Sequence, residues 1–277
     1  MSDYVYRRTY RGPLRAALLD WAGTAVDFGC MAPVRVFVEV FRERGIEITV
    51  EEARAPMGVH KRDHLRAIAR MPRVAELWQL VHSAPCTEAD VEAMFARFLP
   101  QQLQTIPQHA GLVPGILEAQ AEFRRRGMKI GTCTGYSRDI MALLAPAAAA
   151  QGYAPDCVVC ATDVPAGRPA PWMAFRSAME LGVYPMAAWV KIGDTPADIA
   201  EGLNAGMWSV GVVCSGNEVG LTQAELARVD AAARAARYAR ARERLLQAGA
   251  HYVIDTLAEV PALLQWIELR LQAGEQP

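Results

Sequence analysis

The chain has 277 residues, of which 52% are hydrophobic, and its 29 basic residues nearly balance its 30 acidic ones. This length can bury one large core, or a core together with a smaller companion domain. The balanced charge excludes proteins that bind nucleic acid through a clustered positive surface. No stretch is apolar for long enough to span a bilayer, and no signal-type segment follows the polar residues 1–13. We therefore expect a cytoplasmic protein that binds neither membranes nor nucleic acid.

The six cysteines are scattered along the chain, which is far too long for a small disulfide scaffold. Cys157 and Cys160 have the CxxC spacing of some zinc and redox sites. They fall, however, in an apolar run that predicts a strand, where side chains three positions apart point to opposite faces. We therefore interpret both as buried thiols.

A short apolar run at residues 15–20 begins the predicted sheet. It ends in Asp20 and a Gly-Thr turn, which is typical of a buried parallel strand leading into a loop. Further strands are predicted at 128–134, 157–161, 188–193, 208–214 and 251–254. Helices are predicted between them at 115–126, 137–150 and 172–181, and another begins at Thr195-Pro196. This alternation predicts an α/β fold with a Rossmann-like parallel sheet.

Residues 33–107 interrupt the alternation, because they contain no convincing strand. Helices are expected there at 34–44, 49–55, 58–70, 73–82 and 87–104. Thr49 and Thr87 each stand three residues before an acidic residue, a pattern typical of a capped helix start. We therefore predict an all-helical cap domain at 30–105, inserted into an α/β core formed by 1–29 and 106–277. Such a cap would lie over the C-terminal ends of the strands, where open α/β sheets bind ligands.

A capping pattern at Thr222 and Glu225 predicts one long helix that runs to about residue 247. Its exposed face would carry Arg228, Arg234, Arg237, Arg240, Arg242 and Arg244. Two interpretations are open, an anion or nucleic-acid patch and an ordinary solvated face. The neutral net charge of the chain favours the solvated face.

Asp20 is the first candidate catalytic residue. A carboxylate that directly follows a buried strand and precedes Gly23 and Thr24 can attack phosphorus, while backbone N–H groups of the turn receive phosphate oxygens. The alternative is an aspartate that only caps the next turn.

Other strand ends carry residues suited to the same chemistry. Thr134 and Gly135 offer a hydroxyl and a free amide for phosphate, and Arg168 offers a cation for the transferring group. Asp194 and Asp198 follow the fourth strand and suit Mg²⁺, a hard cation that prefers oxygen ligands. Each has an ordinary alternative as a turn residue, a surface charge or a helix-start residue. Their common position at strand ends favours a phosphate-handling active site.

This order of residues resembles the haloacid dehalogenase superfamily, in which a nucleophilic aspartate is followed by Thr, then Lys or Arg, then an acidic metal-binding pair. Phosphatases of that superfamily usually have a second aspartate two positions after the nucleophile, as general acid for an oxygen leaving group. Here that position is Ala22. General acid catalysis typically contributes about 10²–10⁴-fold, so its loss argues against ordinary phosphate-ester hydrolysis.

Lys61 supplies another way to stabilise a leaving group. In a helix at 58–70, Lys61 and His64 share a face, whereas His60 points elsewhere. A lysine attacks an aldehyde only as the free amine, so its pKa must be lowered by burial or by positive charge such as Arg62. His64 is then a candidate proton shuttle for imine formation. For a single lysine or histidine taken alone, a structural or surface role is the more common alternative.

Several segments together resemble the phosphonoacetaldehyde hydrolase (phosphonatase) family over almost the whole chain. They are 20–24, 30–33, 57–64, 134–136, 164–169, 179–185 and 193–195. The combination of a cap lysine with Ala22 is specific to this branch of the superfamily.

The resemblance implies cleavage of phosphonoacetaldehyde to acetaldehyde and phosphate, through a Lys61 Schiff base and an Asp20 aspartyl phosphate. It implies Mg²⁺ held by Asp20, the carbonyl of Ala22 and Asp194, with Asp198 as a further candidate ligand. It also places Met57 and Gly58 near the lysine, places Cys30 and Tyr136 near the active site, and implies a homodimer formed through the cap.

Two other functions remain open on sequence alone. A phosphatase of the same superfamily would cleave a small phosphate ester and would be indifferent to Lys61. A non-catalytic protein would hold a phosphorylated or phosphonate metabolite without turnover, although binding alone needs neither a nucleophile nor an amine.

Overall fold

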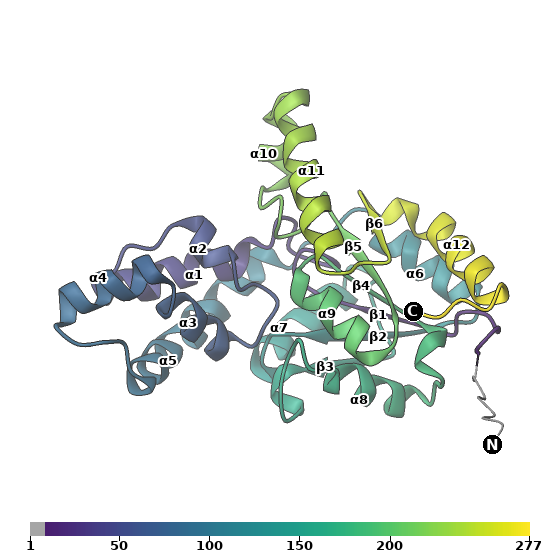
Figure 1. The fold of residues 1–277 in the computed structure, drawn as a ribbon, viewed down its shortest axis with the longest axis horizontal. Helices are drawn as coiled ribbons and strands as arrows, with labels where there is room; N and C mark the ends of the chain where they lie inside the picture. Colours follow the sequence, from purple (N-terminus) through teal and green to yellow (C-terminus); the bar gives the residue numbers. More distant parts are fainter. Residues whose placement is uncertain (1–8) are drawn as a thin grey trace, which may run out of the picture.

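A computed structural model describes residues 9–277. Residues 1–8, which belong to the polar segment considered above for a signal, lie outside the described residues. All six strands are parallel and form one sheet in the order β3-β2-β1-β4-β5-β6 (Figure 1). The strands are β1 (Ala16–Leu19), β2 (Lys129–Thr134), β3 (Cys157–Cys160), β4 (Trp189–Gly193), β5 (Trp208–Val212) and β6 (Tyr252–Ile254). The predicted α/β fold with a parallel sheet is confirmed.

The register of the central strands brings the predicted site residues to one edge. Leu19 of β1 lies beside Thr132 of β2 and Ile192 of β4, so these strands end at nearly the same level. The chain order reverses on either side of β1, which creates a crevice at the C-terminal ends of the strands. Asp20 follows β1 directly into this crevice, and its N–H donates to the carbonyl of Ile192 at 3.0 Å.

Helices cover both faces of the sheet and bury its alternating side chains. Ala17 and Leu19 of β1 belong to the apolar cluster under α6, α7 and α12, whereas Ala16 and Leu18 belong to the opposite cluster under α8. The helices of this part are α6 (Ile116–Arg125), α7 (Arg138–Ala149), α8 (Trp172–Leu181), α9 (Pro196–Ala205), α10 (Gln223–Arg228), α11 (Ala231–Gln247) and α12 (Val260–Gln272). Short 3₁₀ turns are η1 (Ile106–His109), η2 (Ala161–Asp163), η3 (Met186–Ala188) and η4 (Leu257–Glu259). Cys157 and Cys160 are buried and unpaired, as predicted.

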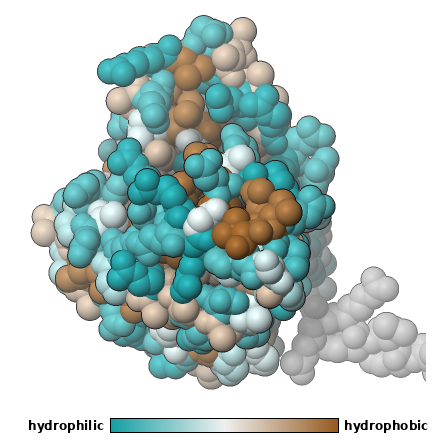
Figure 2. Space-filling model, turned by 90° about the vertical axis from the view of Figure 1, so that its left-hand side faces the viewer, coloured by the Kyte–Doolittle hydropathy of each residue, from teal (hydrophilic) through white to brown (hydrophobic). Residues whose placement is uncertain are grey.

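The first five helices after β1, here called the inserted helices, gather at one end of the molecule, on the left of Figure 1. They are α1 (Met31–Arg42), α2 (Val50–Arg54), α3 (Lys61–Ala69), α4 (Pro72–His82) and α5 (Glu88–Thr105). The predicted capping boxes at Thr49 and Thr87 are both present. Their apolar side chains face inward, and the outer face seen in Figure 2 is mostly hydrophilic with a small apolar patch.

Two predicted helices differ from the structure. Helix α3 begins at Lys61 rather than at 58, because Gly58 has φ +96° and His60 is extended with ψ 139°. The helix predicted from Thr222 to residue 247 is instead two helices. Val229 is extended with ψ 133°, and the Asp230 side chain accepts from Ala233 N at 2.8 Å, so it caps a new helix.

The arginines of this region lie on a solvated face, the interpretation that the neutral charge favoured. Arg228, Arg234, Arg240 and Arg244 are exposed. Arg244 pairs with Glu218 at 2.9 Å, and Arg242 pairs with Asp255. Among residues 9–277, no helix combines the length and the hydropathy needed to cross a membrane.

Candidate active site

A small cavity lies at the C-terminal ends of β1 and β2, under the loop that precedes α3. Its free volume is about 20 Å³. It is lined by Asp20, Ala22, Cys30, Met57, Gly58, Lys61, Thr134, Gly135, Tyr136, Arg168 and Thr195. The structure therefore brings together the predicted nucleophile, the predicted amine and the predicted phosphate-binding residues. His64, Asp194 and Asp198 were also predicted, but they do not line this space.

Asp20 is held by a cation at the base of the cavity. The side chain is only 5% exposed, and its Oδ1 lies 2.7 Å from Nη2 of Arg168. Burial raises the pKa of Asp20, and the positive charges of Arg168 and Lys191 oppose that rise. Arg168 therefore favours the carboxylate form, which is the nucleophilic one.

Asp20, Asp194 and Asp198 form a compact group of buried carboxylates, with one oxygen of each within 4.8 Å of the others. Thr24 Oγ1 donates to Asp194 at 2.9 Å, and the N–H of Asn217 donates to its other oxygen at 2.8 Å. Burial, together with the charges of Asp20 and Asp198, raises the pKa of Asp194 well above its usual range. Oxygen ligands that repel one another when ionised fit a divalent cation such as Mg²⁺.

Asp198 differs from the other two because two buried cations contact one of its oxygens and a helix cap engages the other. Its Oδ1 lies 2.8 Å from Lys191 Nζ and 3.1 Å from Arg168 Nη1. Its Oδ2 accepts from the N–H and the hydroxyl of Thr195, which completes the capping box at the start of α9. Both the predicted helix-start role and a contact with Arg168 are thus present, and metal ligation by Asp198 stays a prediction.

Lys61 is the first residue of α3 and is 5% exposed. Its Nζ lies 3.8 Å from Sδ of Met57, 5.0 Å from the centre of the Tyr136 ring and 5.5 Å from that of Phe37. Burial lowers the pKa of Lys61 to about 8. Arg62, named above as a possible cause, instead pairs with Glu92 at 2.8 Å. Near neutral pH, the apolar surroundings therefore make the free amine far more populated than it is in an exposed lysine.

His64 lies behind Lys61, in the core of the inserted helices. It is fully buried and stacks on Phe37 with ring centres 3.8 Å apart. Its Nε2 is 2.9 Å from the carbonyl of Ala53, and because a carbonyl only accepts, Nε2 carries the proton. Burial, reinforced by the charge of Lys61, lowers the pKa of His64 well below its usual range. The imidazole does not line the cavity, and its role as a proton shuttle stays a prediction.

His60 lies nearer to the reacting groups than its predicted helix position suggested. It precedes α3, and it lines a second small space together with Lys61, Gly135 and Ser137. Burial lowers the pKa of His60, so the neutral form dominates near pH 7. Its extended backbone, which a helix starting at residue 58 would not allow, gives it this position.

Two glycines allow the loop before α3 to close over the strands. A Cβ on Gly58 would overlap the Thr195 hydroxyl, and one on Gly135 would lie 2.5 Å from the carbonyl of Val59. Arg168 Nη1 also donates to the carbonyl of Gly58 at 3.3 Å. The remaining space holds about one water molecule, so any larger substrate enters only when this loop lifts away from the strands.

Arg54 ties the inserted helices to the loop after β5, a link that sequence analysis missed. It donates to the carbonyl of Gly29 at 2.8 Å, to Oδ1 of Asn217 at 3.1 Å and to the carbonyl of Gly220 at 3.1 Å. The N–H of Asn217 in turn holds Asp194. No local pattern reveals this contact, because its partners lie 163 and 166 residues away in the chain.

Replacing Arg54 with Gln is expected to weaken closure of the inserted helices and to raise KM about tenfold, because hydrogen bonds from a charged group are lost. Faster hydrogen exchange in residues 55–60 is the direct readout. Arg42→Gln is the matched control, since Arg42 is exposed and pairs with Glu39 on its own helix. Unchanged exchange and KM in Arg54→Gln would contradict this role.

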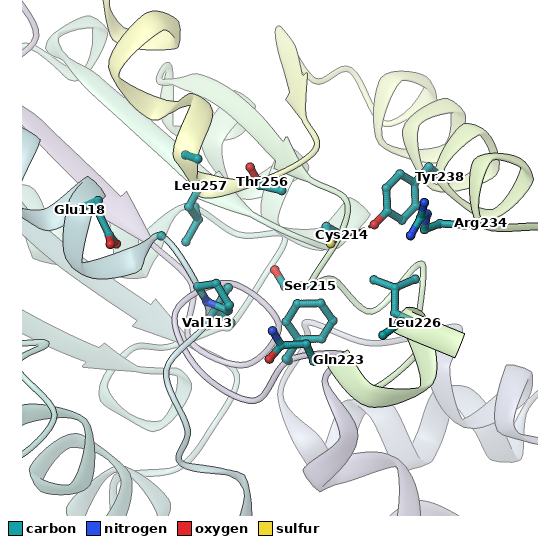
Figure 3. A pocket seen from close by; sticks show the side chains of 15 residues that line it. Val113, Glu118, Cys214, Ser215, Gln223, Leu226, Arg234, Tyr238, Thr256 and Leu257 are labelled. Atoms are coloured by element: carbon teal, nitrogen blue, oxygen red, sulfur yellow. Dashed lines mark hydrogen bonds between the residues drawn. The ribbon is translucent and has the colours of Figure 1, made fainter. Parts of the chain in front are cut away.

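A larger cavity of about 570 Å³ lies away from these residues, on the far side of the loop after β5 (Figure 3). Its walls include Val113, Leu226, Tyr238 and Leu257. Ser215 also lines it, but the Ser215 hydroxyl donates to the carbonyl of Gly23 at 2.7 Å. It contains neither the carboxylate group nor the buried amine, so the smaller cavity is the candidate active site.

Residues 14–206 match the family model of haloacid dehalogenase-like hydrolases, the class that the parallel sheet and the strand-end carboxylates indicate. A phosphonoacetaldehyde hydrolase-like protein of Syntrophobacter fumaroxidans is 52% identical over 97% of both chains. A phosphonoacetaldehyde hydrolase of Nitratidesulfovibrio vulgaris is 50% identical over 100% of this chain and 99% of its own. The crystal structure of a phosphonoacetaldehyde hydrolase-like protein from Oleispira antarctica is 40% identical and has a TM-score of 0.96, with both chains fully covered. The chain therefore belongs to the phosphonoacetaldehyde hydrolase family of enzymes.

Proposed function

We propose that the chain hydrolyses the carbon–phosphorus bond of phosphonoacetaldehyde and releases acetaldehyde and phosphate. The observation that carries this proposal is one cavity lined by both a buried lysine and a buried aspartate, with no acid at position 22. A phosphate-ester hydrolase needs the aspartate but not the amine. The printed names of the relatives agree with this substrate.

The first step joins the aldehyde to Lys61. The free amine attacks the carbonyl carbon, and loss of water gives a protonated imine. The lowered pKa of Lys61 supplies the free amine, and the tight walls of the cavity exclude bulk water from the imine. His60 is better placed than His64 to move protons during loss of water, because it shares a small space with Lys61.

In the second step, a carboxylate oxygen of Asp20 attacks phosphorus and the carbon–phosphorus bond breaks. The bonding electrons move into the protonated imine and form an enamine, so no acid is needed at Ala22. The N–H of Tyr136 donates to the Thr134 hydroxyl at 3.1 Å, which leaves the hydroxyl hydrogen free for a phosphoryl oxygen. The amide of Gly135 would bind another phosphoryl oxygen, and Nη1 of Arg168 would bind a third when the loop that carries the Gly58 carbonyl lifts away.

Hydrolysis of both halves completes the reaction. Water attacks the aspartyl phosphate and restores Asp20, while the enamine is protonated on carbon and the resulting imine is hydrolysed. Asp20, Asp194 and the carbonyl of Ala22 would hold Mg²⁺, with Asp198 behind them, and the ion would offset the negative charge of the transferring group. In balance, one water and one phosphonoacetaldehyde give acetaldehyde and phosphate.

The remaining predicted residues form the walls around the lysine. Burial raises the pKa of Cys30 and of Tyr136 well above their usual ranges, so both side chains stay neutral. Met57 gives Lys61 an apolar neighbour. The domain limits of 30–105 for the cap, the homodimer and the cytoplasmic location belong to the same proposal, and light scattering of the purified protein tests the dimer.

Trapping with borohydride tests the proposal directly. The protein is incubated with phosphonoacetaldehyde and Mg²⁺, reduced and mapped by mass spectrometry, with phosphate release measured in parallel. A reduced adduct on Lys61 with phosphate release is the expected result. Phosphate release from simple esters without an adduct would favour a phosphatase, and binding without either product would favour a non-catalytic binding protein.

The pH dependence of imine formation follows from the pKa of Lys61, which burial lowers to about 8. Only the free amine attacks the aldehyde, so the trapping rate should be constant above that pKa and fall about tenfold for each pH unit below it. The rate of trapping with acetaldehyde between about pH 6 and pH 10 checks this. A midpoint near 10.5, the ordinary lysine value, would contradict the buried position of the amine.

A further inference from the structure

Behind the phosphate-binding side of the cavity lies an ion pair that the proposed reaction does not use. Lys191 is in the middle of β4, Glu201 is on α9, and both are fully buried. Lys191 Nζ lies 3.1 Å from Oε2 of Glu201 and 2.8 Å from Oδ1 of Asp198. Helix α9 approaches the strand this closely because residue 202 is glycine, where a Cβ would lie 2.9 Å from that of Lys191.

Glu201 and a backbone carbonyl help to fix the Arg168 guanidinium beside Asp20. Nε of Arg168 donates to Oε2 of Glu201 at 2.9 Å, and Nη2 donates to the carbonyl of Cys133 at 2.8 Å. Nη2 also reaches Asp20 at 2.7 Å, and Nη1 reaches Asp198 at 3.1 Å. All three guanidinium nitrogens therefore have fixed partners, and the plane of the group is determined before a phosphoryl group arrives.

Glu201 can do this only because Lys191 is present. A carboxylate with no exposed surface is costly to keep ionised unless cations offset its charge. Arg168 contacts the carboxylates of Asp20, Asp198 and Glu201, and Lys191 is a second buried cation beside two of them. Lys191 Nζ contacts Asp198, Glu201 and the Cys133 thiol, and none of these three residues lines the cavity.

We propose that Lys191 and Glu201 are positioning residues that fix Arg168 and Asp198 for phosphoryl transfer. This inference rests on the proposed function, because it assigns the pair to the phosphorus half of that reaction. Neither residue lines the imine side of the cavity, so Lys61 chemistry should not depend on them. If the pair served only to stabilise the fold, replacing it would impair the imine half and the phosphorus half of the reaction equally.

Isosteric variants separate these roles. Glu201→Gln and Lys191→Met each remove one charge, and the double variant removes both, so buried charge is again balanced. Two readouts avoid the full reaction: affinity for tungstate, a tetrahedral phosphate analogue, in the presence of Mg²⁺, and borohydride trapping of acetaldehyde on Lys61. Lys129→Met, which alters an exposed lysine on β2, is the matched control.

We expect each single variant, and also the double variant, to bind tungstate about tenfold to hundredfold more weakly, with acetaldehyde trapping unchanged within about twofold. The double variant should regain thermal stability relative to Lys191→Met without regaining tungstate affinity. If Lys191→Met does not fold, the tungstate affinities of Glu201→Gln and of the double variant still test the proposed role.

Wild-type tungstate affinity in the double variant would overturn the inference, as would equal losses in tungstate binding and trapping. If the wild-type protein binds tungstate but does not cleave phosphonoacetaldehyde, the proposed function fails, while the tungstate series still decides whether the pair positions Arg168.

Discussion

Replacing Lys61 with Arg is expected to lower phosphonoacetaldehyde cleavage by on the order of 10⁴-fold or more, because an arginine cannot form the imine that accepts the carbon–phosphorus electrons. The positive charge and much of the side-chain volume are kept, so the fold should survive. Phosphate release and borohydride trapping are measured together, and both should disappear.

Tungstate affinity gives the internal control for Lys61→Arg, because the proposed phosphate-binding residues Thr134, Gly135 and Arg168 are unchanged. Lys129→Arg is the matched substitution at an exposed lysine of β2 and should behave as wild type. Near wild-type turnover in Lys61→Arg would refute the imine mechanism. Residual activity on simple phosphate esters alone would support a phosphatase.

Replacing Asp20 with Asn should abolish phosphate release to a similar extent, on the order of 10⁴-fold or more, while leaving imine formation intact. The amide has the same shape as the carboxylate but is a very poor nucleophile toward phosphorus. Mass spectrometry after reduction should therefore find the intact substrate attached to Lys61, with its phosphonate still in place.

Asp139→Asn is the control for this substitution, because Asp139 is exposed in the first turn of α7. The two main variants should thus fail at different stages, Lys61→Arg before the imine and Asp20→Asn after it. Phosphate release by Asp20→Asn at the wild-type rate would show that another group, or water, attacks phosphorus.

Local patterns predicted most of the fold because each strand is short, apolar and bounded by its own turn. The residues after those strands could also be assigned to one site, since parallel strands end at the same edge of a sheet. The errors have local causes as well. A helix was expected to run through Val229 and Asp230, yet Asp230 is a strong N-cap and begins a new helix there.

The sequence contains a signal for Lys191 that sequence analysis missed. A lysine inside the apolar strand β4 must bury its charge against partners, and this alone marks it as unusual. The sequence contains no such signal for its partner Glu201 or for the long-range contacts of Arg54, because both depend on how helices pack against distant loops.

The parallel sheet, the helical insertion and the set of groups at the strand ends could be predicted from the sequence, because they follow from local periodicity and strand direction. How those groups act depends on contacts formed in the folded protein. In the folded protein, Lys61 is buried deeply enough for its pKa to be lowered, and His64 lies behind Lys61. Lys191 and Glu201 lie behind Arg168. Burial and the pairing of charges depend on contacts between residues far apart in the chain, and no local pattern contains them.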